Sequence, residues 1–301
     1  MNTTPINIVY FGSNNFSAEV LLTLLKYKNI SVKYIVTKFD KKQGRGNKVL
    51  QNPLVKIANL NKIPVIQVTS LLKNPLQLNK IDFSKIDLGV VVSFAFILPY
   101  DILCQVKKGF INLHPSLLPK YRGPSPIIPG IINNDVYLGV STMLLNEGMD
   151  TGPILLQQKI KQNYNLIYPQ IEQILINKGS KLLYKSIMDY NNGILKPIPQ
   201  SNKNVSVTKY IQKQDGFVTL TENSLHIYNL YRAYYSWPGI FTKIENLEQF
   251  NGFKFKVGDK QTIIKLKQVM LNHEQKLVIK QVQLPNKPVI SWSDFLNGYK
   301  V

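Results

Sequence analysis

Short runs of β-branched and other apolar residues recur through the first 115 residues, and they constrain the fold more than any other feature of the chain. Each run is continuously apolar rather than alternating, which is typical of strands that are buried on both faces. Segments with apolar residues at helical spacing lie between them, at 17–26 and 53–62. The runs cover residues 6–12, 31–38, 63–68, 88–94 and 109–114. Strands and helices that alternate in this way predict a parallel sheet in a Rossmann-like α/β domain.

The pattern changes after about residue 190. Residues 190–206 concentrate Asn, Gly, Pro and Ser, and we interpret them as a linker. A helical segment follows at 224–235, and then come partly alternating segments of the kind that form half-buried antiparallel strands. These candidate strands are residues 253–257, 262–271 and 276–284. The sequence therefore predicts an α/β domain at 1–189, the linker, and a small β-barrel domain at 207–301.

The composition is that of a soluble globular protein. Hydrophobic residues make up 44% of the chain and its mean hydropathy is -0.08. The longest apolar run, 88–98, is well short of the ~20 residues that a membrane helix needs. The first residues lack the charged start and apolar run of a leader peptide. We therefore expect a protein of the cytoplasm, or of the equivalent compartment of an organelle or endosymbiont, that does not associate with a membrane.

The single cysteine indicates the redox compartment, and the net charge indicates the kind of partner. A single cysteine, Cys104, forms no internal disulfide and fits a reducing compartment, and we expect it to be a small buried residue. Lys and Arg outnumber Asp and Glu by 37 to 17, which gives a net charge of +20 and favours an anionic partner such as a nucleic acid. This charge has limited weight, because lysine and asparagine are also abundant in proteins of AT-rich genomes.

The chemistry of the chain is concentrated after two of the predicted strands. Asn112 and His114 stand two positions apart at the end of one strand, so both side chains can project to the same side. Asp150 lies further on, between Gly148 and Gly152, where a tight backbone could direct its carboxylate inward. Open parallel sheets bind ligands at the carboxyl ends of their strands. We therefore expect these three residues to share one site.

An amide, an imidazole and a carboxylate form a coherent set for acyl transfer. Neither Ser116 nor Cys104 shows a local sign of activation, so we expect the amine of a substrate to attack directly rather than through an acyl-enzyme. Asn112 could donate to an oxyanion, His114 could transfer a proton, and Asp150 could orient the imidazole. Structural roles are the alternatives: a buried histidine, an asparagine that caps its loop, and an aspartate that closes an Asx turn. The residues alone leave that choice open.

Two motifs favour catalytic roles for these residues over structural ones. Residues 112–126, NLHPSLLPKYRGPSP, and 148–152, GMDTG, resemble the signature of the 10-formyltetrahydrofolate-dependent formyltransferases. The resemblance implies that Asn112, His114 and Asp150 are the catalytic set, that 10-formyltetrahydrofolate is the formyl donor, and that no metal takes part. It also implies that the loops around residues 93–99 and 116–119 line the folate pocket. The residues expected there are Phe94, Ala95, Phe96, Leu98, Ser116, Leu117, Leu118, Pro119, Glu147 and Gly148.

The rest of the chain resembles the branch of that family that formylates methionyl-tRNA. The segments at 232–239, RAYYSWPG, and 291–299, SWSDFLNGY, are similar to motifs of its C-terminal domain, which is an OB-like barrel whose basic side meets tRNA. Residues 38–48 resemble its flexible insertion at the tRNA acceptor end. The resemblance implies tRNA contacts by Lys38, Lys41, Lys42, Arg45 and Lys48. It also implies initiator methionyl-tRNA as the partner, and we expect a monomer.

Departures and alternatives remain at this point. The segment at 10–16, YFGSNNF, keeps the Gly and the final Phe of the branch's F-x-G-T-P-D-F motif but differs at Tyr10, Ser13, Asn14 and Asn15. A formyltransferase for a nucleotide-linked amino sugar, of the UDP-4-amino-4-deoxy-arabinose type, would share the catalytic set without needing the basic loop. A formyltetrahydrofolate hydrolase would use water as the acceptor. A non-catalytic RNA-binding protein on the same scaffold is the alternative from another class.

Overall fold

The structure is a computed structural model of the chain, and it describes residues 4–43, 48–71 and 75–301. The chain divides into two compact units. The first comprises residues 1–123, 139–160 and 172–207, and the second comprises residues 124–138, 161–171 and 208–301. Two short segments within residues 1–189, the predicted first domain, thus belong to the second unit, and residues 190–206, the predicted linker, lie with the first.

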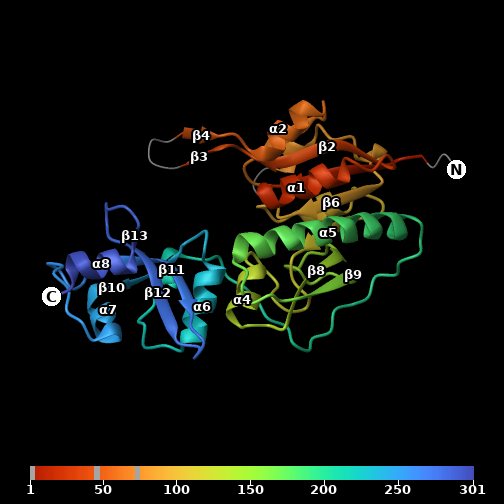
Figure 1. Cartoon of the computed structure of the whole chain (residues 1–301). Coiled ribbons are helices and arrows are strands. Elements are labelled where there is room, and N and C mark those ends of the chain that lie inside the picture. Colours follow the sequence, from red (N-terminus) through yellow and green to blue (C-terminus); the bar gives the residue numbers. More distant parts are fainter. Residues whose placement is uncertain (1–3, 44–47, 72–74) are drawn as a thin grey trace. The chain divides into compact units, whose positions relative to one another are not determined.

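A mixed seven-stranded sheet forms the centre of the first unit, in the order β5-β2-β1-β6-β7-β8-β9 (Figure 1). Its strands are β1 Ile6–Gly12, β2 Ile30–Lys38, β5 Val65–Val68, β6 Leu88–Val92, β7 Phe110–His114, β8 Tyr137–Leu144 and β9 Ile154–Lys161. The strands β5, β2, β1, β6 and β7 are parallel, and β8 is antiparallel to β7. All five predicted runs are strands of this sheet. The predicted α/β class with a parallel sheet is therefore confirmed.

Helices and 3-10 turns connect the strands of this unit. They are α1 Asn15–Leu24, α2 Pro53–Leu60, α3 Tyr100–Leu103, α5 Tyr168–Asn191, η1 Pro75–Leu78 and η2 Phe83–Lys85. The β1 to α1 turn is short because Asn14 and Ser17 form a reciprocal capping box. Gly12 has no space for a side chain, since a Cβ there would lie 2.7 Å from the Cβ of Ser17. The predicted strand, turn and helix at the start of the chain are confirmed.

A small two-stranded antiparallel ladder follows β2. It joins β3, Lys41–Gln43, to β4, Lys48–Leu50, with Lys42 opposite Val49. The backbone of this segment, predicted as a flexible insertion over residues 38–48, is thus partly in strands.

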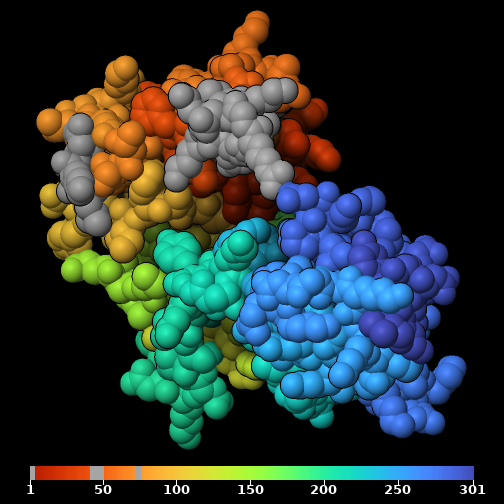
Figure 2. Space-filling model, turned by 90° about the vertical axis from the view of Figure 1, so that its left-hand side faces the viewer, coloured from red at the N-terminus to blue at the C-terminus, as the bar shows by residue number. Residues whose placement is uncertain are grey.

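The second unit contains a four-stranded antiparallel sheet in the order β10-β11-β12-β13. Its strands are β10 Ile240–Lys243, β11 Ile263–Leu271, β12 Leu277–Gln283 and β13 Ile290–Ser291, and its helices are α4 Ile127–Ile132, α6 Ser224–Ala233, α7 Ile244–Asn251, α8 Trp292–Tyr299 and the 3-10 turn η3 Lys213–Gly216. In the space-filling view of Figure 2, the C-terminal residues of the chain are coloured blue and lie together. Ile264, Leu266 and Val269 are buried while Lys265 and Lys267 are exposed, as the alternation predicts. The predicted small antiparallel β-domain is confirmed.

Two local predictions are wrong. Residues 253–257 form no strand, and only Phe255 makes an isolated bridge, to Lys300. The ring of Phe255 is buried against Trp292 and Phe295, and backbone hydrogen bonds of Lys254 and Lys256 to the C-terminal residues flank the single bridge, so the segment is held without forming a strand. Cys104 is exposed rather than buried, because it lies at the C-cap of the short surface helix α3.

Candidate active site

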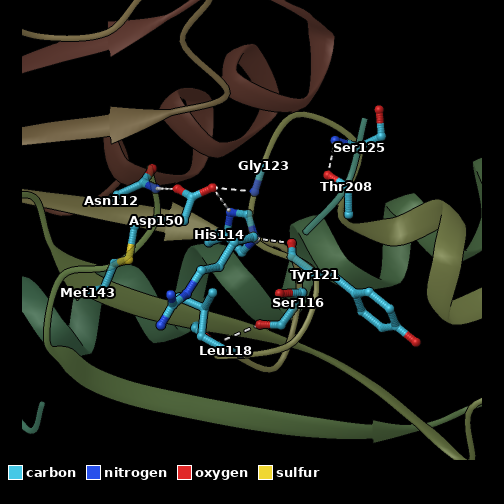
Figure 3. A network of polar contacts seen from close by, with 12 residues as sticks. Asn112, His114, Ser116, Leu118, Tyr121, Gly123, Ser125, Met143, Asp150 and Thr208 are labelled. Atoms are coloured by element: carbon cyan, nitrogen blue, oxygen red, sulfur yellow. Dashed lines mark hydrogen bonds and ion pairs between the residues drawn. The ribbon is translucent and has the colours of Figure 1, made fainter. Parts of the chain in front are cut away.

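The central strand β7 carries the first two residues of the site. Every residue of β7 is buried, and the strand pairs with β6 on one side and β8 on the other. Asn112 is 8% exposed and His114 is 4% exposed. Figure 3 shows both side chains directed toward Asp150, as their spacing of two along a strand predicts. The strand therefore fixes an amide and an imidazole at its carboxyl end.

Asp150 comes from the turn between β8 and β9. Its backbone is left-handed, with φ of 53°, a conformation that aspartate tolerates better than most residues. The Asx turn is made by Asn146, whose Oδ1 accepts hydrogen bonds from the backbone N–H of Gly148 (3.2 Å) and the hydroxyl of Thr151 (2.8 Å). Gly152 must be glycine, because a Cβ there would lie 1.7 Å from the carbonyl oxygen of Leu144. These contacts close the turn without the carboxylate of Asp150, which instead contacts residues that are distant in the sequence.

Those contacts join the three residues (Figure 3). Asp150 Oδ1 lies 3.4 Å from Nδ2 of Asn112, which donates to it. Asp150 Oδ2 accepts a hydrogen bond of 2.7 Å from the backbone N–H of Gly123 and lies 3.7 Å from Nδ1 of His114. The Asp150 side chain is 15% exposed, so the carboxylate is buried but still reached by solvent. The structure brings the predicted set together around one carboxylate.

The contacts of His114 settle its tautomer. Its Nε2 lies 2.9 Å from the carbonyl oxygen of Tyr121, and a carbonyl only accepts hydrogen bonds, so Nε2 carries a hydrogen. In the neutral imidazole the lone pair is then on Nδ1, the nitrogen that faces Asp150. The ring can gain and release a proton at Nδ1 while its other nitrogen stays fixed.

The residues expected around a folate lie on loops that follow neighbouring strands. After β6, Phe94 packs at its edges against Phe11 and Phe96, with ring centroids 5.3 Å and 5.5 Å apart. The backbone N–H of Ala95 donates to the hydroxyl of Ser13 (2.9 Å), and Leu98 is buried in the core. This loop is therefore held to the turn after β1.

The loop after β7 is fixed through its backbone. The hydroxyl of Ser141 donates to the carbonyl of Ser116 (2.6 Å) and accepts from the N–H of Leu118 (3.1 Å). Gln157 donates to the carbonyl of Leu118 (2.9 Å). Of the other residues expected here, Leu117 and Pro119 are half-buried, while Glu147 and Gly148 are exposed in the turn before Asp150. These hydrogen bonds fix the backbone of the loop.

The chemistry of these loops fits a folate. Phe94 and Phe96 are half-buried and Ile97 and Met149 are exposed, which offers apolar surface to a flat ring. Asn112 and His114 lie at the end of β7, directly before the loop at 115–119, as pockets with few placed polar groups require. Within the described part of the chain, no cluster of three His, Cys, Asp or Glu side chains is placed to hold a metal.

The residues expected to contact tRNA lie apart from this set in the sequence. Lys38 ends β2, Lys41 and Lys42 are in β3, and Lys48 begins β4. Arg45 lies outside the described residues. The structure therefore describes the backbone that carries four of these five residues.

Sequence reasoning missed the residues that hold the set in place. Tyr121 supplies the carbonyl for His114, and Gly123 supplies the N–H for Asp150. Arg122 and Gln200 form a further pair behind Asp150, with Nε and a terminal nitrogen of Arg122 at 3.1 Å and 2.8 Å from Oε1 of Gln200. The YRG triplet inside the first motif could have indicated Tyr121 and Gly123. Gln200 and its neighbours stand in the predicted linker, where no pattern marks them.

Known proteins share both parts of the chain. Residues 6–187 match the sequence model of the Formyl transferase family, and residues 210–300 match that of the Formyl transferase C-terminal domain. The methionyl-tRNA formyltransferase of Trichodesmium erythraeum is 32% identical over 98% of this chain and 96% of its own length. That of Caldicellulosiruptor saccharolyticus is 31% identical over 98% of each chain. The chain belongs to the methionyl-tRNA formyltransferases.

A solved structure is similar as well. A sugar 3-N-formyltransferase, determined in the presence of dTDP and 5-N-formyl-THF, matches with a TM-score of 0.63 over 99% of this chain and 97% of its own. Its sequence identity is 21%, so this likeness shows the fold alone. Among the helices of the described residues, none has the length and hydropathy to cross a membrane.

Proposed function

We propose that the chain transfers the formyl group of 10-formyltetrahydrofolate to the α-amine of initiator methionyl-tRNA. The observation that carries this is the contact of one carboxylate, that of Asp150, with both Asn112 and His114. It occurs in a chain whose curated relatives of nearly full length are methionyl-tRNA formyltransferases. The bound donor would supply an N-formyl group whose carbon is the electrophile.

Asn112 would stabilise the charge that develops on the formyl oxygen. Its Nδ2 carries two hydrogens, and the 3.4 Å contact with Asp150 occupies one of them. The other is available to an oxyanion. A donor that is fixed by a buried strand needs no reorganisation during the reaction, which is why such groups contribute strongly to the rate.

His114 would move the proton. The attacking amine loses a proton as its bond to the formyl carbon forms, and the leaving nitrogen of the donor gains one as its own bond to that carbon breaks. Nδ1 of His114 can take the first and deliver the second, since Nε2 is held by the Tyr121 carbonyl. The carboxylate of Asp150, 3.7 Å from Nδ1, would stabilise the imidazolium form between these two transfers.

The acceptor distinguishes this proposal from formyl transfer to an amino sugar. Full-length relatives at 31% and 32% identity act on methionyl-tRNA by name, whereas the sugar enzyme is 21% identical. The net charge of +20 suits a polyanion such as tRNA. We propose that Lys38, Lys41, Lys42, Arg45 and Lys48 contribute phosphate contacts, and that the protein acts as a monomer in the cytoplasm.

The test is a transfer assay with several acceptors. The purified protein is given 10-formyltetrahydrofolate with initiator methionyl-tRNA, with UDP-4-amino-4-deoxy-arabinose, or with no acceptor. We expect formylated methionyl-tRNA and no product in the other two reactions. Transfer to the sugar alone, or release of formate without an acceptor, would contradict the proposal while leaving the fold assignment intact.

A further inference from the structure

Residues 194–207, here called the strap, pack along the first unit beside the catalytic set. Ile198 pairs with Ile154 through two backbone hydrogen bonds of 2.8 Å each. Val207 forms an isolated parallel bridge with Arg122, in the loop that follows His114. The sequence suggests only a Pro- and Asn-rich connection here. The backbone pairing shows that both the turn before β9 and the loop after β7 are in contact with the strap.

Gln200 of the strap holds the turn that carries Asp150. Its Nε2 donates to the carbonyl oxygens of Asp150 and Gly152, at 2.8 Å each. Its Oε1 accepts the two hydrogen bonds from Arg122. Since a guanidinium only donates, Arg122 fixes which end of the amide faces the turn. The amide therefore acts as a brace between Arg122 and the left-handed backbone of Asp150.

Ser206 of the strap holds the loop that carries the partner of His114. Its hydroxyl accepts a hydrogen bond from the N–H of Tyr121 (2.9 Å), and its carbonyl accepts one from the N–H of Arg122 (2.9 Å). Tyr121 is left-handed, with φ of 62°, which is unfavourable for a bulky residue without such support. The carbonyl of the same Tyr121 receives Nε2 of His114. The strap thus reaches His114 through one intervening residue.

We propose that Gln200 and Ser206 are positioning residues for formyl transfer. Gln200 acts through the Asp150 turn, and Ser206 acts through the Tyr121 carbonyl on the orientation and tautomer of His114. This inference rests on the proposed function. It makes the segment that joins the two parts of the chain a component of the active site rather than a passive connection.

The decisive experiment is a double-mutant cycle between Gln200 and Asp150. Gln200→Leu removes the brace, and Gln200→Glu keeps an acceptor for Arg122 but places carboxylate oxygens against two carbonyls. We expect either change to lower kcat about ten- to a hundredfold, because small misplacements of catalytic groups cost that much, with KM for tRNA little changed. In an Asp150→Asn background the same Gln200 changes should cause no further fall in kcat, since the carboxylate that they misplace is absent.

The controls separate this inference from the proposed function. Asn202→Ala alters an exposed amide in the same strap and should leave kcat unchanged. If the wild type does not formylate methionyl-tRNA, the proposed function fails. If the wild type does so, and the Gln200 variants either keep wild-type kcat or lose as much in the Asp150→Asn background, the positioning role of Gln200 is wrong.

Ser206 is tested without turnover. The ring nitrogens of His114 are followed by ¹⁵N NMR in the resting protein, in the wild type and in Ser206→Ala. We expect the wild type to show the hydrogen on Nε2, and the variant to show a mixture of the two neutral tautomers with faster exchange of that hydrogen. An unchanged His114 spectrum in Ser206→Ala would overturn the role of Ser206.

Discussion

Two buried polar networks, one in each unit, differ in how completely they are closed. In the second unit, Arg232 of α6 is 0% exposed and donates to the carbonyls of Leu166 (2.8 Å) and Asn163 (3.2 Å) and to Oδ1 of Asn229 (2.9 Å). Burial lowers the pKa of this guanidinium, but arginine still keeps its charge at neutral pH. Every contact of the network is of ordinary hydrogen-bond length, and the side chains of Arg232 and Asn229 are both buried.

The network around Asp150 is looser. Its contacts with Asn112 and His114 are 3.4 Å and 3.7 Å long, and its side chain keeps 15% exposure. Hydrogen bonds of active sites are often long before substrate binds and tighten in the complex. The short contacts are instead made by backbone groups, from Gly123 to Asp150 and from His114 to Tyr121. A closed network stabilises the fold, whereas an open one keeps donors for a ligand.

The largest expected effect comes from a substitution that disrupts the open network, the one around Asp150. Asp150→Asn keeps the shape and tolerates the left-handed backbone but removes the charge that faces His114. We expect kcat to fall about a hundredfold or more, as for other losses in general acid–base catalysis, with the unfolding midpoint little changed. Single-turnover formylation of methionyl-tRNA measures it, and Asp82→Ala, an exposed aspartate far along the chain, is the control. Wild-type turnover would remove Asp150 from the catalytic set.

The next largest effect comes from a substitution that disrupts the closed network, the one around Arg232. Arg232→Met keeps much of the side-chain volume but leaves the carbonyls of Leu166 and Asn163 and the buried Oδ1 of Asn229 without their donor. We expect the free energy of unfolding to fall by about 1–3 kcal/mol, the usual cost of unsatisfied buried groups, while kcat per folded molecule stays unchanged. Urea unfolding followed by fluorescence measures this, with the exposed Lys267→Met as the control. A loss of kcat at full folding would place Arg232 in the reaction instead.

The smallest effect concerns Tyr231, which neighbours Arg232 on α6. Burial raises the pKa of Tyr231 to about 12. An unfolded tyrosine ionises near pH 10, so between about pH 10 and 12 the unfolded chain releases a proton that the folded chain retains. The stability contribution is therefore fully present below pH 10 and is lost as the pH rises through about 12. Tyr231→Phe should show a shallower decline in unfolding free energy over this window than the wild type, and an identical decline would contradict the shift.

The sequence predicts the strands β1, β2, β5, β6 and β7 well because each is a short apolar run and the runs are separated by turns and helical segments. It predicts that Asn112, His114 and Asp150 lie together, because spacing along one strand determines side-chain direction and because the two motifs resemble a known family. It fails at residues 253–257, where alternation suggests a strand but a single aromatic side chain, Phe255, determines the packing. It also misses Gln200, since contacts made 50 residues apart by a lone amide leave no local pattern.

The most direct test of the central claim is the single-turnover rate of formyl transfer to methionyl-tRNA by His114→Ala. The measurement uses excess protein loaded with 10-formyltetrahydrofolate, together with an unfolding curve for the same sample. The account predicts a rate about a hundredfold or more below that of the wild type at an unchanged unfolding midpoint, because the imidazole that accepts and delivers the proton is removed. A wild-type rate in this variant would show that the network around Asp150 does not carry the chemistry.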